Sequence, residues 1–278
     1  MQHGTISLLK VSKMLKLGRV ERYILDEIGK NGCIHMTLLD PENFSPQDIA
    51  KCAKMCEEQG TGAIMVGGSI FQSQTALDEC VKMIKENVSI PVILFPNNVN
   101  AISKHADAIW FMSLLNSTDW YYIIGAQMQG SFLVKKYALE AIPMGYLVFG
   151  SDTAVSAIGR VLPLPLNKGE VAAGYALAAQ YLGMRFVYLE AGSGAQNHIP
   201  PETIRAVRDV VDITVVVGGG ITSPEHSHIV AKAGADVIVT GNVVEKSKNA
   251  ELLSKIIQAA KEGAASRPWP KKTLPPIP

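Results

Sequence analysis

The chain has 278 residues, of which 47% are hydrophobic and 18% are charged, and its formal net charge is +1. This is the composition of a globular protein with a large core, and the length fits one large α/β barrel or two small domains. The small net charge gives no overall attraction to nucleic acid, no apolar run is long enough to span a membrane, and the N-terminus lacks the features of a signal peptide.

The N-terminal segment, residues 1–31, has apolar residues at helical spacing, and we expect an amphipathic helix there that packs outside the barrel described below. Apolar runs that read as buried parallel strands follow in chain order at 33–39, 63–66, 92–95, 108–112, 145–149, 186–189, 213–217 and 237–239. The segments between them predict helices at 47–59, 75–86, 120–139 and 170–182, helices that begin at Pro200-Pro201 and Ser223-Pro224, and a last helix at 250–262.

Strands that alternate with helices in this way predict right-handed βαβ units that close into a (β/α)8 barrel. Residues 95–107 are too few for a full crossover helix with its loops, so we expect the third helix of the barrel to be missing or very short. Residues 151–166 contain Pro163 and Pro165 and are expected to be irregular. We expect one domain over residues 1–278, with a proline-rich tail at 266–278 that is extended or disordered.

Three consecutive predicted strands end in glycine-rich loops. The loops contain Glu190 with Gly192-Ser193-Gly194, then Gly218-Gly219-Gly220, and then Gly241-Asn242. Glycine allows a ligand to approach the backbone closely, and free N–H groups at helix starts attract anions. The loops after strands seven and eight of such a barrel commonly hold a phosphate. One such loop alone would be explained by a tight turn, but three in succession favour a phosphate site with a carboxylate beside it.

Oxygen-bearing side chains dominate the predicted strand ends. Asp40, Ser69 and Glu190 follow strands, whereas no strand ends in lysine, cysteine or histidine, which argues against a Schiff-base aldolase. Oxygen ligands suit Mg²⁺, which is often held by one or two protein groups and by substrate phosphates. Asp40 could equally be a helix cap, and Ser69 taken alone is more simply structural.

Histidine and cysteine positions give no metal site. His226 and His228 lie two apart at a helix start, where they point to different sides, so we expect a solvated surface there. The four cysteines lack zinc-type spacing and are interpreted as buried free thiols in a cytoplasmic protein.

Seven motifs occur in the right order between about residue 32 and residue 245. They are HMTLLDP (35–41), VGGS (66–69), DAIWFMSLLNS (107–117), IPMGY (142–146), YLEAGSG (188–194), VGGGI (217–221) and TGN (240–242). In combination they resemble the geranylgeranylglyceryl phosphate synthase family, and within it the second of two groups. The resemblance implies a modified TIM barrel that lacks its third helix, which agrees with the short segment 95–107.

The same resemblance implies a reaction in which the 3-hydroxyl of sn-glycerol 1-phosphate attacks C1 of geranylgeranyl diphosphate or another all-trans prenyl diphosphate. An ether forms and diphosphate leaves. Asp40 and Ser69 would hold Mg²⁺, and Glu190 and Tyr188 would be catalytic, with Glu190 orienting the hydroxyl or accepting its proton. The residues that would bind sn-glycerol 1-phosphate are Tyr188, Leu189, Glu190, Ala191, Gly192, Ser193, Gly194, Gly219, Gly220, Gly241 and Asn242.

Aromatic residues suggest where the prenyl chain and a second subunit would lie. Trp110, Phe111 and Tyr146 either flank an apolar groove beside the missing helix or are ordinary core residues. The aromatic run 120–122 begins an outer helix and predicts an oligomer, for which the resemblance implies a dimer or a hexamer. Release of a lipid product also suggests transient contact with a membrane.

Three alternatives stay open at this point. A phosphosugar isomerase or lyase barrel would share the phosphate site but would need an acid/base pair at other strand ends. A lipid-binding barrel without activity would explain an apolar groove but not the two carboxylates. A prenyltransferase of the same family could use another chain length or another phosphorylated three-carbon acceptor.

Overall fold

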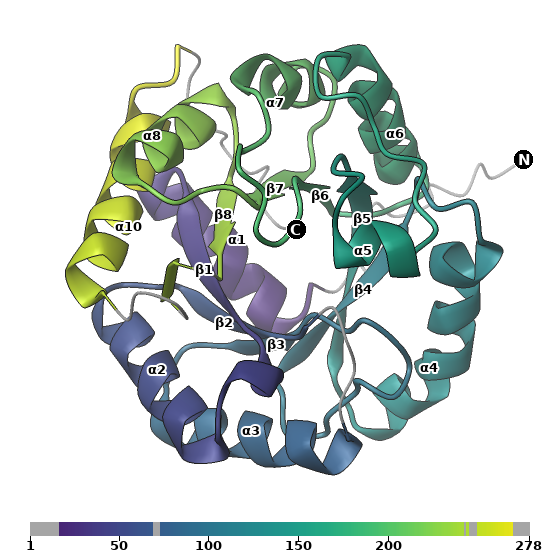
Figure 1. The fold of residues 1–278 in the computed structure, drawn as a ribbon, viewed down its shortest axis with the longest axis vertical. Coiled ribbons are helices and arrows are strands. Elements are labelled where there is room, and N and C mark those ends of the chain that lie inside the picture. The colour runs from purple at the N-terminus through teal and green to yellow at the C-terminus, as the bar shows by residue number, and fades with distance from the viewer. Residues whose placement is uncertain (1–16, 69–72, 242, 245–248, 269–278) are drawn as a thin grey trace, which may run out of the picture.

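Eight parallel strands close into a barrel in sequence order, and helices surround it (Figure 1). The computed structural model describes residues 17–68, 73–241, 243–244 and 249–268. The strands are β1 (Ile34–Leu39), β2 (Ala63–Val66), β3 (Val92–Leu94), β4 (Ala108–Leu114), β5 (Glu140–Val148), β6 (Phe186–Glu190), β7 (Thr214–Gly218) and β8 (Val237–Thr240). β1 pairs with β8 as well as with β2, which closes the sheet and confirms the predicted (β/α)8 barrel.

The helices of the outer ring follow their strands as expected. They are α2 (Pro46–Glu58), α3 (Gln74–Asn87), α4 (Ala126–Lys136), α6 (Gly169–Tyr181), α7 (Pro201–Arg208), α8 (Pro224–Ala233) and α10 (Ala250–Ala265). α2 and α8 each begin with a serine cap followed by proline at the first helical position, so the local sequence fixes where both helices start.

The segment 95–107 between β3 and β4 contains no helix, which confirms that the third barrel helix is missing. Ile102 and Ser103 of this segment are buried, and Ile102 packs against the cluster formed by β2, β3 and α3. The carbonyl of Ile102 also accepts a hydrogen bond from the side chain of Gln74 at 3.2 Å. The segment is therefore an ordered wall of the barrel, although it is too short to form a helix.

Three elements differ from expectation in their boundaries. The helix predicted at 120–139 begins with a π-helical turn, Tyr121–Gly125, before α4. β5 begins at Glu140, five residues earlier than expected, because it pairs with β4 from Ala108↔Glu140 onwards. The irregular stretch 151–166 contains the short helix α5 (Ala154–Ile158), which Thr153 caps.

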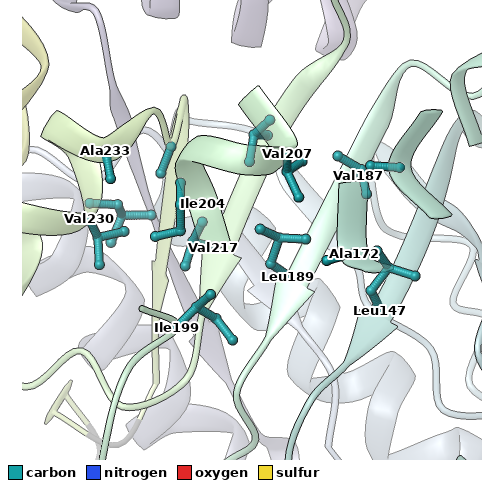
Figure 2. Packing of buried hydrophobic residues seen from close by; sticks show 14 of the residues in the cluster. Leu147, Ala172, Val187, Leu189, Ile199, Ile204, Val207, Val217, Val230 and Ala233 are labelled. Carbon is teal, nitrogen blue, oxygen red and sulfur yellow. The ribbon is translucent and has the colours of Figure 1, made fainter. Parts of the chain in front are cut away.

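The core has an inner layer within the barrel and an outer layer between the strands and the helices. Figure 2 shows part of the outer layer, where β5–β7 pack against α6, α7 and α8. Small residues such as Ala172 and Ala233 let the helices lie close to the Val and Leu side chains of the strands. The four cysteines are free and buried, as expected.

Helix α1 (Arg19–Asn31) lies outside the barrel, as expected, and packs across one end of it. Its residues Val20, Ile24 and Ile28 belong to the same buried cluster as the interior of the barrel. In Figure 1 this helix lies behind the ring of strands and crosses it. The carboxylate of Glu140, at the start of β5, accepts hydrogen bonds of 2.8 Å from two N–H groups in the first turn of α1. α1 therefore closes the N-terminal end of the barrel.

The tail was expected to be extended or disordered from residue 266. Arg267 instead forms an ion pair with Asp236, at 3.3 Å, and donates to the carbonyl groups of Ala231 and Ala235. The beginning of the tail is thus bound to the barrel, while residues 269–278 lie outside the described part of the chain.

Candidate active site

A cavity of about 580 Å³ opens at the C-terminal ends of the strands. One side is formed by the glycine loops after β6, β7 and β8, and Asp40 and Glu190 both line it. The other side is apolar and lies between the segment 95–107 and α4, where Ile102 and Val134 form part of the wall. The cavity therefore joins a polar region rich in backbone N–H groups to an apolar region where the third helix is missing.

Glu190 is the last residue of β6 and is buried. One carboxylate oxygen, Oε1, accepts a hydrogen bond from the N–H of Gly192 at 2.6 Å, and Oε2 accepts from the hydroxyl of Tyr146 at 3.4 Å. Burial raises the pKa of this carboxyl, although the bonds from Gly192, Tyr188 and Tyr146 oppose that shift. A carboxylate with a raised pKa in a cavity is suited to accept a proton from a bound hydroxyl.

Two tyrosines form hydrogen bonds to this carboxylate, and a phenylalanine packs against both of them. Tyr146, Tyr188 and Phe95 lie with their centroids 5.3 to 5.6 Å apart. Burial raises the pKa of both tyrosines well above the usual range, and the nearby Glu190 carboxylate raises them further. The tyrosines are therefore neutral hydrogen-bond donors to Glu190.

The sequence predicted Tyr188 and Glu190 as neighbouring site residues. It did not predict that Phe95 packs against Tyr188 or that Gly218 makes room for its hydroxyl group. A Cβ at Gly218 would lie 2.0 Å from the Tyr188 hydroxyl oxygen, so glycine there makes room for the tyrosine. The signal for this role of Gly218 was its position at the end of an apolar strand, but from the sequence alone Gly218 was interpreted only as part of a phosphate-binding loop.

The glycine loops after β6 and β7 pack against each other. Gly219 has a φ of 83°, and a Cβ there would lie 2.6 Å from Oε1 of Glu190 and 2.7 Å from the nitrogen of Gly192. Gly220 has a φ of 68°, and its Cβ would lie 2.3 Å from the carbonyl oxygen of Asn197. Among the described residues, the N–H groups of Gly219, Gly220 and Ile221 have no protein acceptor, and all three residues line the cavity. This arrangement suits an anion bound by backbone donors.

The third loop brings Gly241 to the same cavity, close to the carbonyl of Leu38. Asn242, which was expected to bind the same ligand, lies outside the described residues. Ser193 and Gly194 also line the cavity, whereas Leu189 is buried in the outer layer of the core. Leu189 can therefore contribute only through its backbone.

Asp40 caps a turn and also faces the cavity. Its carboxylate caps the 3-10 turn Pro41–Asn43 by accepting from the N–H of Glu42 at 3.0 Å, and it also lines the cavity. Burial is the main cause that raises its pKa. A Cβ at Gly68 would lie 2.3 Å from Oδ1 of Asp40, so the turn after β2 approaches this carboxylate closely.

The residues around Asp40 fit a Mg²⁺ ion held partly by substrate. The described residues contain no cluster of three or more His, Cys, Asp or Glu side chains that would form a cage for a metal. The Asp40 carboxylate at the cavity wall instead fits the way Mg²⁺ binds through one or two protein groups and substrate phosphates. The second proposed ligand, Ser69, lies outside the described residues.

Two predictions from the sequence concern residues that do not line the cavity. His226 was expected on a solvated surface, but it is half-buried, and its Nδ1 lies 3.2 Å from the carbonyl oxygen of Gly220. In the part of the chain that the structure describes, no helix is long and apolar enough to cross a membrane.

The closed barrel, with glycine loops and a buried carboxylate at its C-terminal end, defines the class of (β/α)8 barrels whose loops after the last strands suit an anion. Within this class, residues 26–261 match the PcrB family, and the chain belongs to that family.

Curated relatives support this membership over nearly the whole chain. Geranylgeranylglyceryl phosphate synthase of Thermofilum pendens is 51% identical over 251 residues, which are 90% of this chain and 98% of the relative. The protein of the same name from Pyrococcus horikoshii is 49% identical over 249 residues, again 90% of this chain and 98% of the relative. The resemblance noted in the sequence is therefore confirmed.

Solved structures agree with the fold. The (S)-3-O-geranylgeranylglyceryl phosphate synthase of Thermoplasma acidophilum, in complex with its substrate sn-glycerol-1-phosphate, superposes with a TM-score of 0.84 at 42% identity. The match covers 89% of this chain and all of that one. Thiamine phosphate pyrophosphorylase from Pyrococcus furiosus, at 15% identity and a TM-score of 0.56, shares the fold alone.

Proposed function

We propose that this protein is a prenyltransferase that joins sn-glycerol 1-phosphate to geranylgeranyl diphosphate in the biosynthesis of archaeal-type ether phospholipids. The observation that carries the proposal is the position of Glu190, a buried carboxylate between backbone N–H donors and an apolar space within one cavity. Relatives with this activity in their names are about half identical to the chain over 90% of its length.

The acceptor fits the polar side of the cavity. The glycine loops after β6, β7 and β8 offer backbone donors to its phosphate, with Ser193 and Asn242 as further contacts. The 3-hydroxyl then points to Glu190, which Gly192 and Tyr146 hold in place. Glu190 accepts the hydroxyl proton, the oxygen forms a bond to C1 of the prenyl group, and the C1–O bond to diphosphate breaks, so that diphosphate leaves with the electron pair.

The diphosphate fits beside Asp40. None of the described residues that line the cavity is a lysine, an arginine or a histidine, so they supply no cationic side chain for this highly charged group. Asp40, together with Ser69, would hold Mg²⁺, and a bound Mg²⁺ would neutralise the charge that develops on the leaving diphosphate. In the same place Asp40 keeps the turn after β1 in shape through its bond to Glu42.

The prenyl chain fits the apolar side of the cavity. Phe111 and Tyr146 line it, as expected for groove residues, and so does Ile102 of the segment that replaces the third helix. Trp110 is also at the wall but is fully buried with its ring 5.1 Å from that of Phe186, so its main role is in the core. The absence of a helix between β3 and β4 leaves room for this chain.

We also propose that the protein works in the cytoplasm as a homo-oligomer, a dimer or a hexamer. An exposed apolar row on the π-turn and α4 supports this, because Trp120, Ile124, Met128 and Phe132 are spaced four apart and are 56–82% exposed. Such a row on a globular protein marks an interaction surface. Light scattering at micromolar concentration should give at least a dimer, and a monomer would contradict this part of the proposal. Product release would involve transient membrane contact.

Incubation with prenyl diphosphates of several chain lengths tests the whole proposal. Each is offered with Mg²⁺ and either sn-glycerol 1-phosphate or another phosphorylated three-carbon acceptor, and the products are identified by mass spectrometry. We expect the geranylgeranyl ether of sn-glycerol 1-phosphate as the main product. Absence of any ether product would favour an isomerase or a lipid-binding barrel, and a product from the other acceptor would correct the substrate.

A further inference from the structure

Two histidines lie next to the phosphate loops but do not line the cavity. His226 is the third residue of α8, and His198 belongs to the loop between β6 and α7. Their rings are in contact, with centroids 4.9 Å apart and planes inclined by 65°. The two residues therefore connect the loop after β6 with the loop after β7.

The contact of His226 with the loop is directional. Its Nδ1 lies 3.2 Å from the carbonyl oxygen of Gly220, and because a carbonyl only accepts, Nδ1 carries a proton and donates it. The backbone of His226 is itself fixed, since its N–H donates to the capping side chain of Ser223 at 3.3 Å. A Cβ at Gly220 would lie 2.6 Å from the nitrogen of His198, so the segment that carries His198 touches the same glycine from another side.

This contact determines where the next N–H points. In a trans peptide the C=O and the N–H point in opposite directions, and the described residues contain no cis peptide. With the carbonyl of Gly220 directed to His226, the N–H of Ile221 is directed away from the histidine. Ile221 lines the cavity, and its N–H has no acceptor among the described residues.

We propose that His226, with His198 packed against it, is a positioning residue for the acceptor phosphate. It holds the peptide between Gly220 and Ile221 in the orientation that presents an N–H, and not a carbonyl oxygen, to the phosphate. Gly220 has no side chain to restrict this peptide, so without the bond to His226 the peptide can rotate and turn its oxygen towards the anion. The inference rests on the proposed function, because it takes the acceptor phosphate as the ligand of this loop.

The experiment compares two substitutions that have the same number of heavy atoms. His226→Asn keeps a side-chain N–H at about the position of Nδ1, whereas His226→Leu removes the donor. Binding of sn-glycerol 1-phosphate to the full-length protein is measured by calorimetry, together with kcat and both KM values. Loss of one hydrogen bond should raise the Kd and the acceptor KM of His226→Leu roughly 3- to 10-fold, with kcat and the prenyl diphosphate KM unchanged. His226→Asn should stay within about twofold of the wild type.

Two further variants serve as controls. His228→Leu changes a histidine of the same helix that is also half-buried but forms no hydrogen bond to the loop among the described residues, and it should bind the acceptor like the wild type. His198→Leu should weaken acceptor binding less than His226→Leu, because His198 acts through ring packing. Thermal unfolding shows whether each variant is folded, and the asparagine and His198 variants keep the test informative if His226→Leu does not fold.

The proposal is overturned if His226→Leu binds the acceptor as tightly as the wild type, or if His226→Asn binds as weakly as His226→Leu. An equal loss in His228→Leu would also overturn it, because the effect would then belong to the helix as a whole. Failure of the proposed function gives a different result: the wild-type protein would itself neither bind nor convert sn-glycerol 1-phosphate.

Discussion

Buried carboxylates have different partners at the two ends of the barrel. At the N-terminal end, buried carboxylates meet cations or helix N–H groups: Glu21 pairs with Arg185 at 2.6 Å, and Asp236 pairs with Arg208 at 2.8 Å and Arg267 at 3.3 Å. At the C-terminal end, Glu190 is buried with only hydroxyl and N–H donors around it among the described residues, and its pKa is raised.

We interpret the difference as one between carboxylates that are paired within the fold and a carboxylate that is available to a ligand. A buried carboxylate paired with arginine satisfies the charge within the protein, and it is costly to break. A buried carboxylate without a cation destabilises the folded state, and such groups cluster at functional sites. Substitutions at the C-terminal end should therefore lower turnover, and substitutions at the N-terminal end should lower stability.

The largest effect on turnover is expected for Glu190→Gln. This change keeps the shape of the side chain and removes the base, and general-base catalysis typically contributes about 10²- to 10⁴-fold. We expect kcat to fall by that factor in a steady-state assay. Tyr146→Phe, which removes one donor to Glu190 but no charge, should lose less. A Glu190→Gln protein with nearly full kcat would show that Glu190 only orients the hydroxyl.

The stability of Glu190→Gln should also depend on pH differently from that of the wild type. Because burial raises the pKa of Glu190 in the folded state, its carboxylate destabilises the fold above that pKa, and this cost is absent below the unfolded-state pKa. Glu190→Gln should therefore match the wild type in melting temperature at low pH and exceed it as the pH rises to neutrality. Equal melting temperatures of the two proteins both near the usual carboxyl pKa of about 4 and at neutral pH would contradict the raised pKa.

The second effect on turnover concerns Asp40 and Mg²⁺. A bound metal contributes several kcal/mol, so Asp40→Asn should lower kcat by a factor on the order of 100. EDTA should abolish turnover in the wild type, and added Mg²⁺ should restore it. Glu42→Gln removes a charge from the same turn but not from the cavity wall, and Ser69→Ala removes no charge, so both should lose less. An unchanged rate and Mg²⁺ dependence in Asp40→Asn would refute this role.

A third change affects binding of the acceptor. Gly219→Val adds a Cβ that would lie 2.6 Å from Oε1 of Glu190, at a residue whose φ is 83°, so the loop must move. We expect the acceptor KM to rise roughly tenfold or more in a variant that is still folded. Gly174→Val, on the exposed side of α6 with nothing within 4 Å of its Cβ, is the matched control. An unchanged acceptor KM would remove Gly219 from the phosphate site.

Local signals predicted most of the fold and part of the site. The strand Ala63–Val66 was predicted with its observed bounds because it is a short apolar run between turn signals. The absence of the third barrel helix was predicted from the small number of residues between β3 and β4. The position of α1 across one end of the barrel could not be predicted, since it depends on Glu140, which lies about 120 residues further along the chain. The contact of Tyr146 with Glu190 spans 44 residues and was likewise invisible in local sequence.

The smallest effect on turnover, and a large effect on stability, is expected at the N-terminal end. Asp236→Asn keeps the size of the side chain but removes the charge between Arg208 and Arg267, which are 7% and 11% exposed. Breaking a buried pair by removing one partner costs about 3–5 kcal/mol, so the melting temperature should fall by several degrees.

The kinetics of Asp236→Asn decide whether the comparison holds. Asp236 also accepts a hydrogen bond of 3.0 Å from the N–H of Val215, so the substitution loosens the starts of both β7 and β8. The phosphate loops lie at the other ends of the same strands, and stable strands between them should isolate the loops from the change. We therefore expect wild-type kcat and acceptor KM well below the melting temperature. A raised acceptor KM there would show that the two ends are coupled and that the buried charges at the N-terminal end also shape the site.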